Sequence, residues 1–125
     1  MTLDHHIRLA YINTLLDGGY TLLADGTENP TEGYIVGGVT EESTMYSTCS
    51  PNPTTHYAQF KELWRTYENM CDEDMNEGVG TWVHKGKIYF DVVELFELVG
   101  DALIAGFRRG ETAIYDCKNK KDMTL

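Results

Sequence analysis

The sequence has few prolines, few cysteines, few basic residues and no long apolar run, and each shortage narrows the choice of protein class. Three prolines and 11% aromatic residues among 125 are typical of a folded domain and not of a disordered acidic tail. The three cysteines, Cys49, Cys71 and Cys117, are widely spaced and odd in number. They therefore predict reduced thiols, and they form neither a CxxC site nor a closed disulfide framework.

Apolar residues never run on for the roughly 18 positions that a membrane span requires. The opening segment, MTLDHHIRLAYINTLLDGG, mixes histidines, an arginine and acids into a short apolar pattern, unlike a signal peptide. We therefore expect a soluble, intracellular protein that has no membrane partner.

Lysine and arginine together number 10 against 20 acidic residues, so the net charge is -10 and the pI is about 4.6. Such a balance disfavours direct contact with nucleic acid and favours basic partners. The excess is concentrated in residues 62–101, where ten acids and three bases give -7. The C-terminal segment is the basic end, and it closes in a polar tail over residues 118–125.

Hydrophobic spacing predicts one α+β domain over residues 1–125, with a mainly antiparallel sheet and about three helices on one face. The first helix follows an apolar pattern from Leu3 to Leu15, with Thr2 as its cap and Gly18-Gly19 as its stop. YTLLA and YIVGGV then read as two strands of a hairpin with a long connection, between Tyr20 and Val39.

The middle of the chain begins with TEESTMYSTCSPNP, which predicts an exposed loop with a short strand near Met45 to Thr48. Thr54 or Thr55 is expected to cap a second helix. That helix carries an inward-facing stripe at three- and four-residue steps: Tyr57, Phe60, Trp64, Tyr67 and Cys71.

The second half is expected to continue with a tight hairpin, a helix and a last strand. A Lys85-Gly86 turn divides GTWVHKGKIYFDVVELFELV into two β-rich runs. GDALIAGFRRG predicts a helix with Asp101 near its start, Arg108-Arg109 near its end and Gly110 as its stop, in keeping with the helix dipole. TAIYDC follows as a final strand before the polar tail KNKKDMTL.

The densest acidic segment, CDEDMNEGVG, partly fits a calcium loop. Asp72, Asp74 and Asn76 occupy its first, third and fifth positions, but Glu77 stands where glycine is needed and Val83 where a glutamate is needed. A noncanonical calcium site and a solvated turn therefore both remain open for this segment.

Catalytic and metal motifs are not evident in the sequence. No carboxylate pair is accompanied by a nucleophile or a glycine-rich phosphate loop. His5, His6, His56 and His84 lack metal spacing, and Cys71 belongs to the apolar stripe. We expect a non-enzymatic protein without a cofactor or a bound metal.

The acids themselves form the candidate site, because carboxylates 5–7 Å apart match the spacing of phosphates along a nucleic-acid strand. Asp91 and Glu94 fall on opposite faces of a straight strand, so their joint exposure requires a bend near Val93. An alternative is that the acids only keep the protein soluble. The predicted contacts for basic side chains are Glu68, Asp72, Glu73, Asp74, Glu77, Asp91, Glu94, Glu97 and Asp101.

The segment from GTWVHKGKIYFDVVELF to AIYDCKNKKDM resembles the C-terminal portion of small uncharacterised acidic proteins of actinobacterial phages and mobile elements. The matching features are the Lys-Gly-Lys turn, YFDV, a helix ending in RRGE, and AIYD; TEGYIVGG is similar to another element of the same group. Gly80, Trp82 and AIYD are also similar to the antirestriction ArdA group. The resemblance implies an anti-defence factor, either an anti-CRISPR inhibitor or an antirestriction DNA mimic.

The sequence and the resemblance together predict a protein that blocks DNA binding by a host CRISPR surveillance complex or restriction enzyme. An acidic, DNA-mimicking surface would occupy the basic DNA-binding groove of that complex. A second hypothesis is a regulatory or assembly module that docks through TEESTMYSTCSPNP, and a third is a noncanonical calcium-binding domain. The first predicts binding that weakens steeply with salt, whereas the second predicts binding that resists salt.

Overall fold

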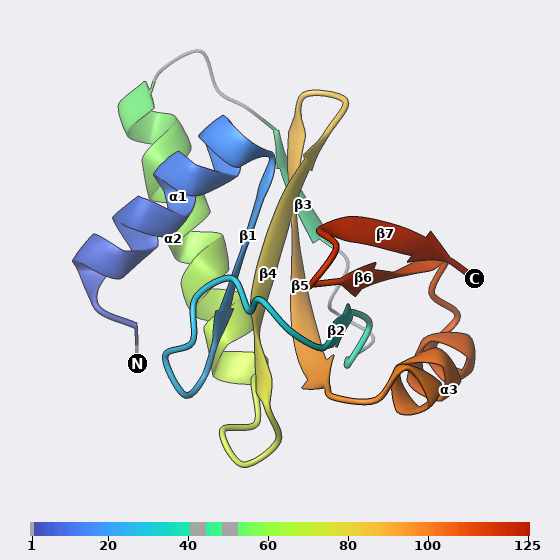
Figure 1. Ribbon diagram of the computed structural model, residues 1–125. Coiled ribbons are helices and arrows are strands. Elements are labelled where there is room, and N and C mark those ends of the chain that lie inside the picture. Colours follow the sequence, from blue (N-terminus) through green and yellow to red (C-terminus); the bar gives the residue numbers. More distant parts are fainter. Residues whose placement is uncertain (1, 41–44, 49–52) are drawn as a thin grey trace.

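The computed structural model describes residues 2–40, 45–48 and 53–125, and these form three helices and seven strands (Figure 1). The order along the chain is α1 (Asp4–Asp17), β1 (Gly19–Leu23), β2 (Tyr34–Val36), β3 (Met45–Thr48), α2 (Pro53–Met70), β4 (Glu77–His84), β5 (Lys87–Phe96), α3 (Val99–Arg109), β6 (Ala113–Asp116) and β7 (Lys121–Thr124). The strands form a single sheet in the order β1-β4-β5-β2-β6-β7, with β3 also paired to β5, and every pairing is antiparallel. The predicted α+β class is confirmed.

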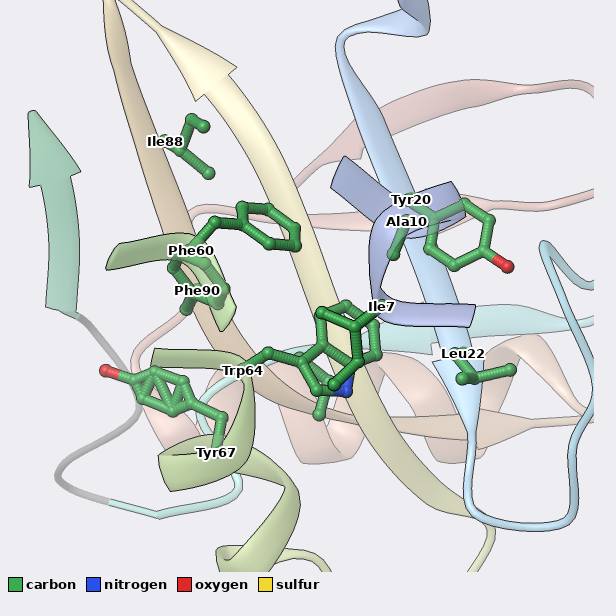
Figure 2. Close-up of a cluster of buried hydrophobic side chains, with 10 residues drawn as sticks. Ile7, Ala10, Tyr20, Leu22, Phe60, Trp64, Tyr67, Ile88 and Phe90 are labelled. Carbon is green, nitrogen blue, oxygen red and sulfur yellow. The ribbon is translucent and has the colours of Figure 1, made fainter. Parts of the chain in front are cut away.

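The main core lies between α1, α2 and the strands β1, β4 and β5. Phe60, Trp64 and Tyr67 of α2 are fully buried, which confirms the predicted aromatic stripe (Figure 2). The ring of Phe60 lies 5.0 Å from that of Phe90 on β5, measured between centroids. Aromatic pairs at this separation add to the stability that area burial alone provides.

A second, smaller core lies under α3, where Ala102 packs with Val36 of β2 and Ile114 of β6. Phe96 of β5 packs against this cluster, and Phe90 packs against α2. The two phenylalanines are six positions apart on one strand, and side chains an even number of positions apart share a face of the sheet. All three helices therefore cover the same face, as the sequence predicted.

The β4–β5 hairpin is the longest pairing of the sheet and was correctly predicted. His84 pairs with Lys87, and the two residues between them have positive φ angles, 51° at Lys85 and 75° at Gly86. Positive φ at both central residues is typical of the two-residue turns that match strand twist. The other edge of β5 is shared, because β3 pairs with its first half and β2 with its last three residues.

The predicted hairpin between Tyr20 and Val39 is wrong. β1 pairs with β4, and β2, which ends at Val36, lies between β5 and β6. β1 can approach β4 closely because Gly78 has no side chain, and an added Cβ there would collide with the backbone of Leu22. Pairing over a long sequence separation, which no local turn signal specifies, thus decides the position of both strands.

Several element ends differ from the prediction. Thr2 does not cap α1: its backbone N–H donates to Glu68 at 2.8 Å, and the N-cap position is Leu3. The second helix begins at Pro53, before both predicted capping threonines. The polar tail contributes β7, which pairs with β6 through contacts such as Met123 opposite Ile114.

The glycine stops of two helices are confirmed, with left-handed φ angles of 85° at Gly18 and 71° at Gly110. The short strand predicted near Met45 to Thr48 is also confirmed as β3. The remainder of the predicted loop falls largely on residues 41–44 and 49–52, which lie outside the described residues.

Candidate functional site

Three connections meet at one end of the sheet. β1 ends there with Leu23 opposite Gly78, β4 begins with Glu77 opposite Glu94, and β5 ends with Phe96 opposite the start of β2. Because the pairings are antiparallel, the segments 24–33, 71–76 and 97–98 all leave the sheet at this end. Figure 1 shows the loop between α2 and β4 beside the end of β5.

Backbone hydrogen bonds hold these connections together. The Ala24 N–H donates to the Glu77 carbonyl at 2.8 Å, and the Leu95 N–H donates to the Asn76 carbonyl at 3.0 Å. The loop that precedes β4 is therefore fixed to β1 on one side and to β5 on the other. Residues distant in sequence are brought into one neighbourhood by these contacts.

The side chains that this end of the sheet presents are strongly acidic. Segments 24–33, 71–76 and 97–101 contain neither lysine nor arginine. Glu28 in the first segment is exposed too, but it pairs back against Leu22 of β1 and is not counted here. The other exposed carboxylates of these segments, together called the acidic end, are Asp25, Glu32, Asp72, Glu73, Asp74, Glu97 and Asp101. Five of these were predicted contact residues, whereas Asp25 and Glu32 were missed because they lie far from the acidic central region in the sequence.

Hydrogen bonds between residues close in sequence fix some of these carboxylates within their loops. Asp72 accepts a hydrogen bond from the Asp74 N–H, and Asp25 accepts one from the Thr27 N–H, both at 2.9 Å. The bond from Thr27 lowers the pKa of Asp25. Because hydrogen bonds to the charged form favour ionisation, Asp25 carries its negative charge at neutral pH.

Two predicted contact residues are buried and are removed from the surface set. Glu77 is 7% exposed and accepts a hydrogen bond from the Asp72 N–H at 3.0 Å. Asp91 is 5% exposed and accepts one from the Gly38 N–H at 3.1 Å. These carboxylates organise the protein's own backbone, so they cannot also meet the basic side chains of a partner in this conformation.

Two further predicted residues, Glu94 and Glu68, are partly buried and paired with arginine. Glu94 binds Arg109 at 2.5 Å, and Glu68 binds Arg65 at 3.2 Å. For Glu68, burial opposes ionisation, but hydrogen bonds from Thr2 and Arg65 outweigh it and lower the pKa of the carboxyl. Much of the negative charge of both groups is therefore neutralised within the molecule.

The sequence predicted that Asp91 and Glu94 can be exposed together only if β5 bends near Val93, and the structure contains no such bend. β4 and β5 pair without interruption from Glu77 opposite Glu94 to His84 opposite Lys87, so no bulge near Val93 rotates the strand. Asp91 and Glu94 consequently stay on opposite faces. The predicted surface shifts from β5 itself to the connections at its end.

The calcium-like segment is a turn closed by its own hydrogen bonds. Asn76 has a left-handed φ of 36°, and the Asp72 carboxylate accepts the Asp74 N–H described above. Among the residues that the structure describes, no group of three or more histidine, cysteine, aspartate or glutamate side chains is arranged to hold a metal ion. The geometry thus favours the solvated turn over a calcium loop.

The cysteines of the described chain are protonated thiols. Burial, with Glu77 and Glu68 nearby, raises the pKa of Cys71 to about 12, and burial with Asp116 nearby raises that of Cys117 to about 11. A thiolate is the nucleophilic form of cysteine, so neither side chain has the ionisation that a catalytic thiol requires. Cys71 packs against the main core, as its place on the apolar stripe predicted.

Basic residues flank one side of the acidic end. The Cys117 N–H donates to the Gly33 carbonyl at 3.1 Å, which places the turn between β6 and β7 beside the start of β2. Lys118 and Lys120 on this turn are exposed. The negative surface is therefore bounded on this side by the basic tail that the sequence predicted.

Comparisons with protein-family models, with curated proteins and with solved structures find no match to this chain. Among the described residues, no helix combines the length and the apolar character needed to cross a bilayer. What the fold and the site define together is a small α+β domain with a negatively charged end.

Proposed function

We infer that the protein is a non-enzymatic inhibitor that uses the acidic end to bind the basic groove of a DNA-recognition complex. By occupying this groove it keeps DNA out, and the complex is a component of a bacterial defence system. The resemblance to proteins of phages and mobile elements suggests a CRISPR surveillance complex or a restriction enzyme as the partner. The working compartment is then the cytoplasm of the host bacterium.

The observation that carries the proposal is the arrangement of seven exposed carboxylates at one end of the sheet, on segments that contain neither lysine nor arginine. Groups of like charge held close together create a potential that attracts a surface of opposite sign and speeds association. A DNA-binding groove is lined by lysine and arginine for the same electrostatic reason. The acidic end offers this groove fixed carboxylates in the place of phosphates.

The test uses purified complexes of both classes and a fluorescent DNA target. DNA binding is measured by anisotropy while the protein is added at about 50 mM and at about 300 mM salt. We expect competition with DNA that weakens at the higher salt, because charge attraction is screened within about 10 Å at 0.1 M. Undisturbed DNA binding by every complex at the lower salt contradicts the proposal.

A matched pair of variants tests whether the inhibition of DNA binding depends on the acidic end. The first variant carries Asp72→Asn, Asp74→Asn and Glu97→Gln, and the second removes three exposed carboxylates elsewhere through Asp17→Asn, Glu62→Gln and Asp122→Asn. Both variants lose three negative charges. Inhibition is expected to fall at least tenfold for the first variant and to stay near wild type for the second. Equal loss in both would mean that net charge matters and the acidic end does not.

A second candidate is again a docking module, but with its contact surface on the outer face of α1 in place of the predicted loop TEESTMYSTCSPNP. Leu9, Ile12 and Leu16 follow one another at helical spacing and are 46%, 43% and 76% exposed. Grouped apolar side chains on a surface are typical of protein–protein contacts. Binding through this face would resist salt and would be lost in Ile12→Glu, whereas Ile12→Glu leaves binding through the acidic end unchanged.

A further inference from the structure

A cavity of about 250 Å³ lies between the start of α1, the second half of α2 and the paired strands β1 and β4. It borders the acidic end, since Ala24, Gly26 and Glu73 belong to its lining. Its wall also includes Leu22, Leu23, Trp64, Glu68 and Val79. The cavity is smaller than the roughly 300–1,000 Å³ pockets of drug-sized ligands, so its size suits a molecule comparable to one side chain.

Trp64 supplies a hydrogen-bond donor that has no acceptor. The side chain is fully buried, and its indole Nε1–H finds no partner within residues 2–40, 45–48 and 53–125. In Figure 2 the indole nitrogen is on the edge of the ring that faces Leu22, another residue of the cavity wall. Buried N–H groups are almost always paired in folded proteins, so this donor calls for an acceptor beyond those that the described residues supply.

The rest of the lining divides into apolar walls and a negative rim. Leu22, Leu23 and Val79 give the cavity its apolar surface, and Glu68 and Glu73 are its two carboxylates. Lysine and arginine do not occur among the described residues that line it. Glu68 already binds the Thr2 N–H and Arg65, but a carboxylate has about four acceptor positions and can receive a further donor.

We propose that this cavity binds a small amphipathic organic cation. The apolar body of the ligand lies between Leu22, Leu23 and Val79, an oxygen at its inner end accepts the Trp64 indole N–H, and a positive charge at its outer end meets Glu68 and Glu73. Glu73 belongs both to this rim and to the acidic end, but ligand binding can be measured without any partner protein, so it is tested separately from the proposed inhibition.

Three related probes separate the two polar contacts. Tyramine carries both a phenolic oxygen and an ammonium group, phenethylamine lacks the oxygen, and tyrosol lacks the charge. Binding is followed in ¹H–¹⁵N spectra through the indole resonance of Trp64, which Trp82→Phe distinguishes from the only other tryptophan. Tyramine is expected to shift this resonance in a saturable way. Loss of either polar group is expected to weaken binding about threefold to tenfold.

A pair of variants on α2 tests the negative rim. Glu68→Gln is expected to weaken tyramine binding without changing tyrosol binding, and Glu62→Gln, on an exposed position of the same helix, is expected to change neither. If Glu68→Gln disturbs folding, which the same spectra reveal, the comparison of tyramine with tyrosol on the unmodified protein still decides the question. A Trp64 resonance that does not move with about 10 mM tyramine overturns the proposal, and so does equal affinity for all three probes.

Discussion

Replacing Gly78 with alanine is expected to push β1 and β4 apart at the acidic end. The new Cβ would lie 2.6 Å from the Cα of Leu23 and 2.8 Å from the carbonyl carbon of Leu22, both closer than a Cβ atom tolerates. Both neighbours are backbone atoms, so no side-chain rotation relieves the contact. The strands must separate, and the hydrogen bonds between them lengthen.

The expected loss of stability follows from two opposing terms. Overfilling a packed site costs about 1–3 kcal/mol, and a contact with backbone belongs to the upper part of that range. Alanine regains about 0.5–1 kcal/mol, because glycine loses more conformational freedom on folding. Gly78→Ala should therefore lower the free energy of unfolding by about 1–2 kcal/mol.

Gly100→Ala is the matched control. This glycine lies in the first turn of α3, and no heavy atom lies within 4 Å of the position that a Cβ would take. Its replacement is expected to raise the free energy of unfolding by about 0.5 kcal/mol. Urea unfolding followed by circular dichroism measures both variants, with an unchanged slope indicating that the transition is still comparable. A Gly78→Ala protein as stable as the wild type would refute the close approach of β1 and β4.

Three further predictions concern charge and the thiols. Burial raises the pKa of Glu111 against the influence of Arg109, so its ionised form destabilises the folded protein. Glu111→Gln should therefore raise the free energy of unfolding in urea at pH 7, and this advantage should shrink as the pH falls through the raised pKa towards the ordinary value for glutamate. A gain that grows at low pH would contradict this sign. A double-mutant cycle of Glu94→Gln with Arg109→Met should give a coupling of about 1–2 kcal/mol, since both side chains are largely buried, and additive effects would contradict the pairing. Cys71 and Cys117 should react slowly with iodoacetamide at about pH 8 in the folded protein and rapidly in guanidinium chloride, as peptide mass mapping can establish; fast labelling of the folded protein would contradict the raised pKa values.

The elements that local signals specify were predictable from the sequence. The spacing of Phe60, Trp64 and Tyr67 predicted the buried face of α2, and Lys85-Gly86 predicted the turn of the longest hairpin. A regular period or a turn residue is sufficient evidence in such cases, because the interactions involved are close in sequence.

The pairing of β1 and the existence of β7 were not predictable in the same way. β1 finds its partner across more than fifty residues, and the closeness of this pairing depends on the missing side chain of Gly78. The strand Lys121–Thr124 has Met123 as its one apolar residue, so it shows no alternating pattern. Tertiary contacts with β6, and not local preference, hold this segment in a strand.

In the candidate site, too, the features set by local sequence were predictable and those set by tertiary contacts were not. A run of acids in the sequence correctly placed Asp72 and Asp74 on an exposed turn, since a local excess of charge favours solvent. Asp91 is buried because it accepts the N–H of Gly38, 53 positions away, and no sequence pattern indicates that bond. Asp25 joins the surface through a pairing of β1 that was not foreseen.

The most direct test of the central claim is a ¹H–¹⁵N titration of the protein with a short oligolysine peptide, which needs no knowledge of the natural partner. If the acidic end is one continuous negative surface, the largest shifts fall together on segments 24–33, 71–76 and 97–101 and disappear at about 300 mM salt. Asp17, Glu62 and Asp122, which are exposed elsewhere, then shift little. Shifts of similar size at all exposed carboxylates would contradict the claim.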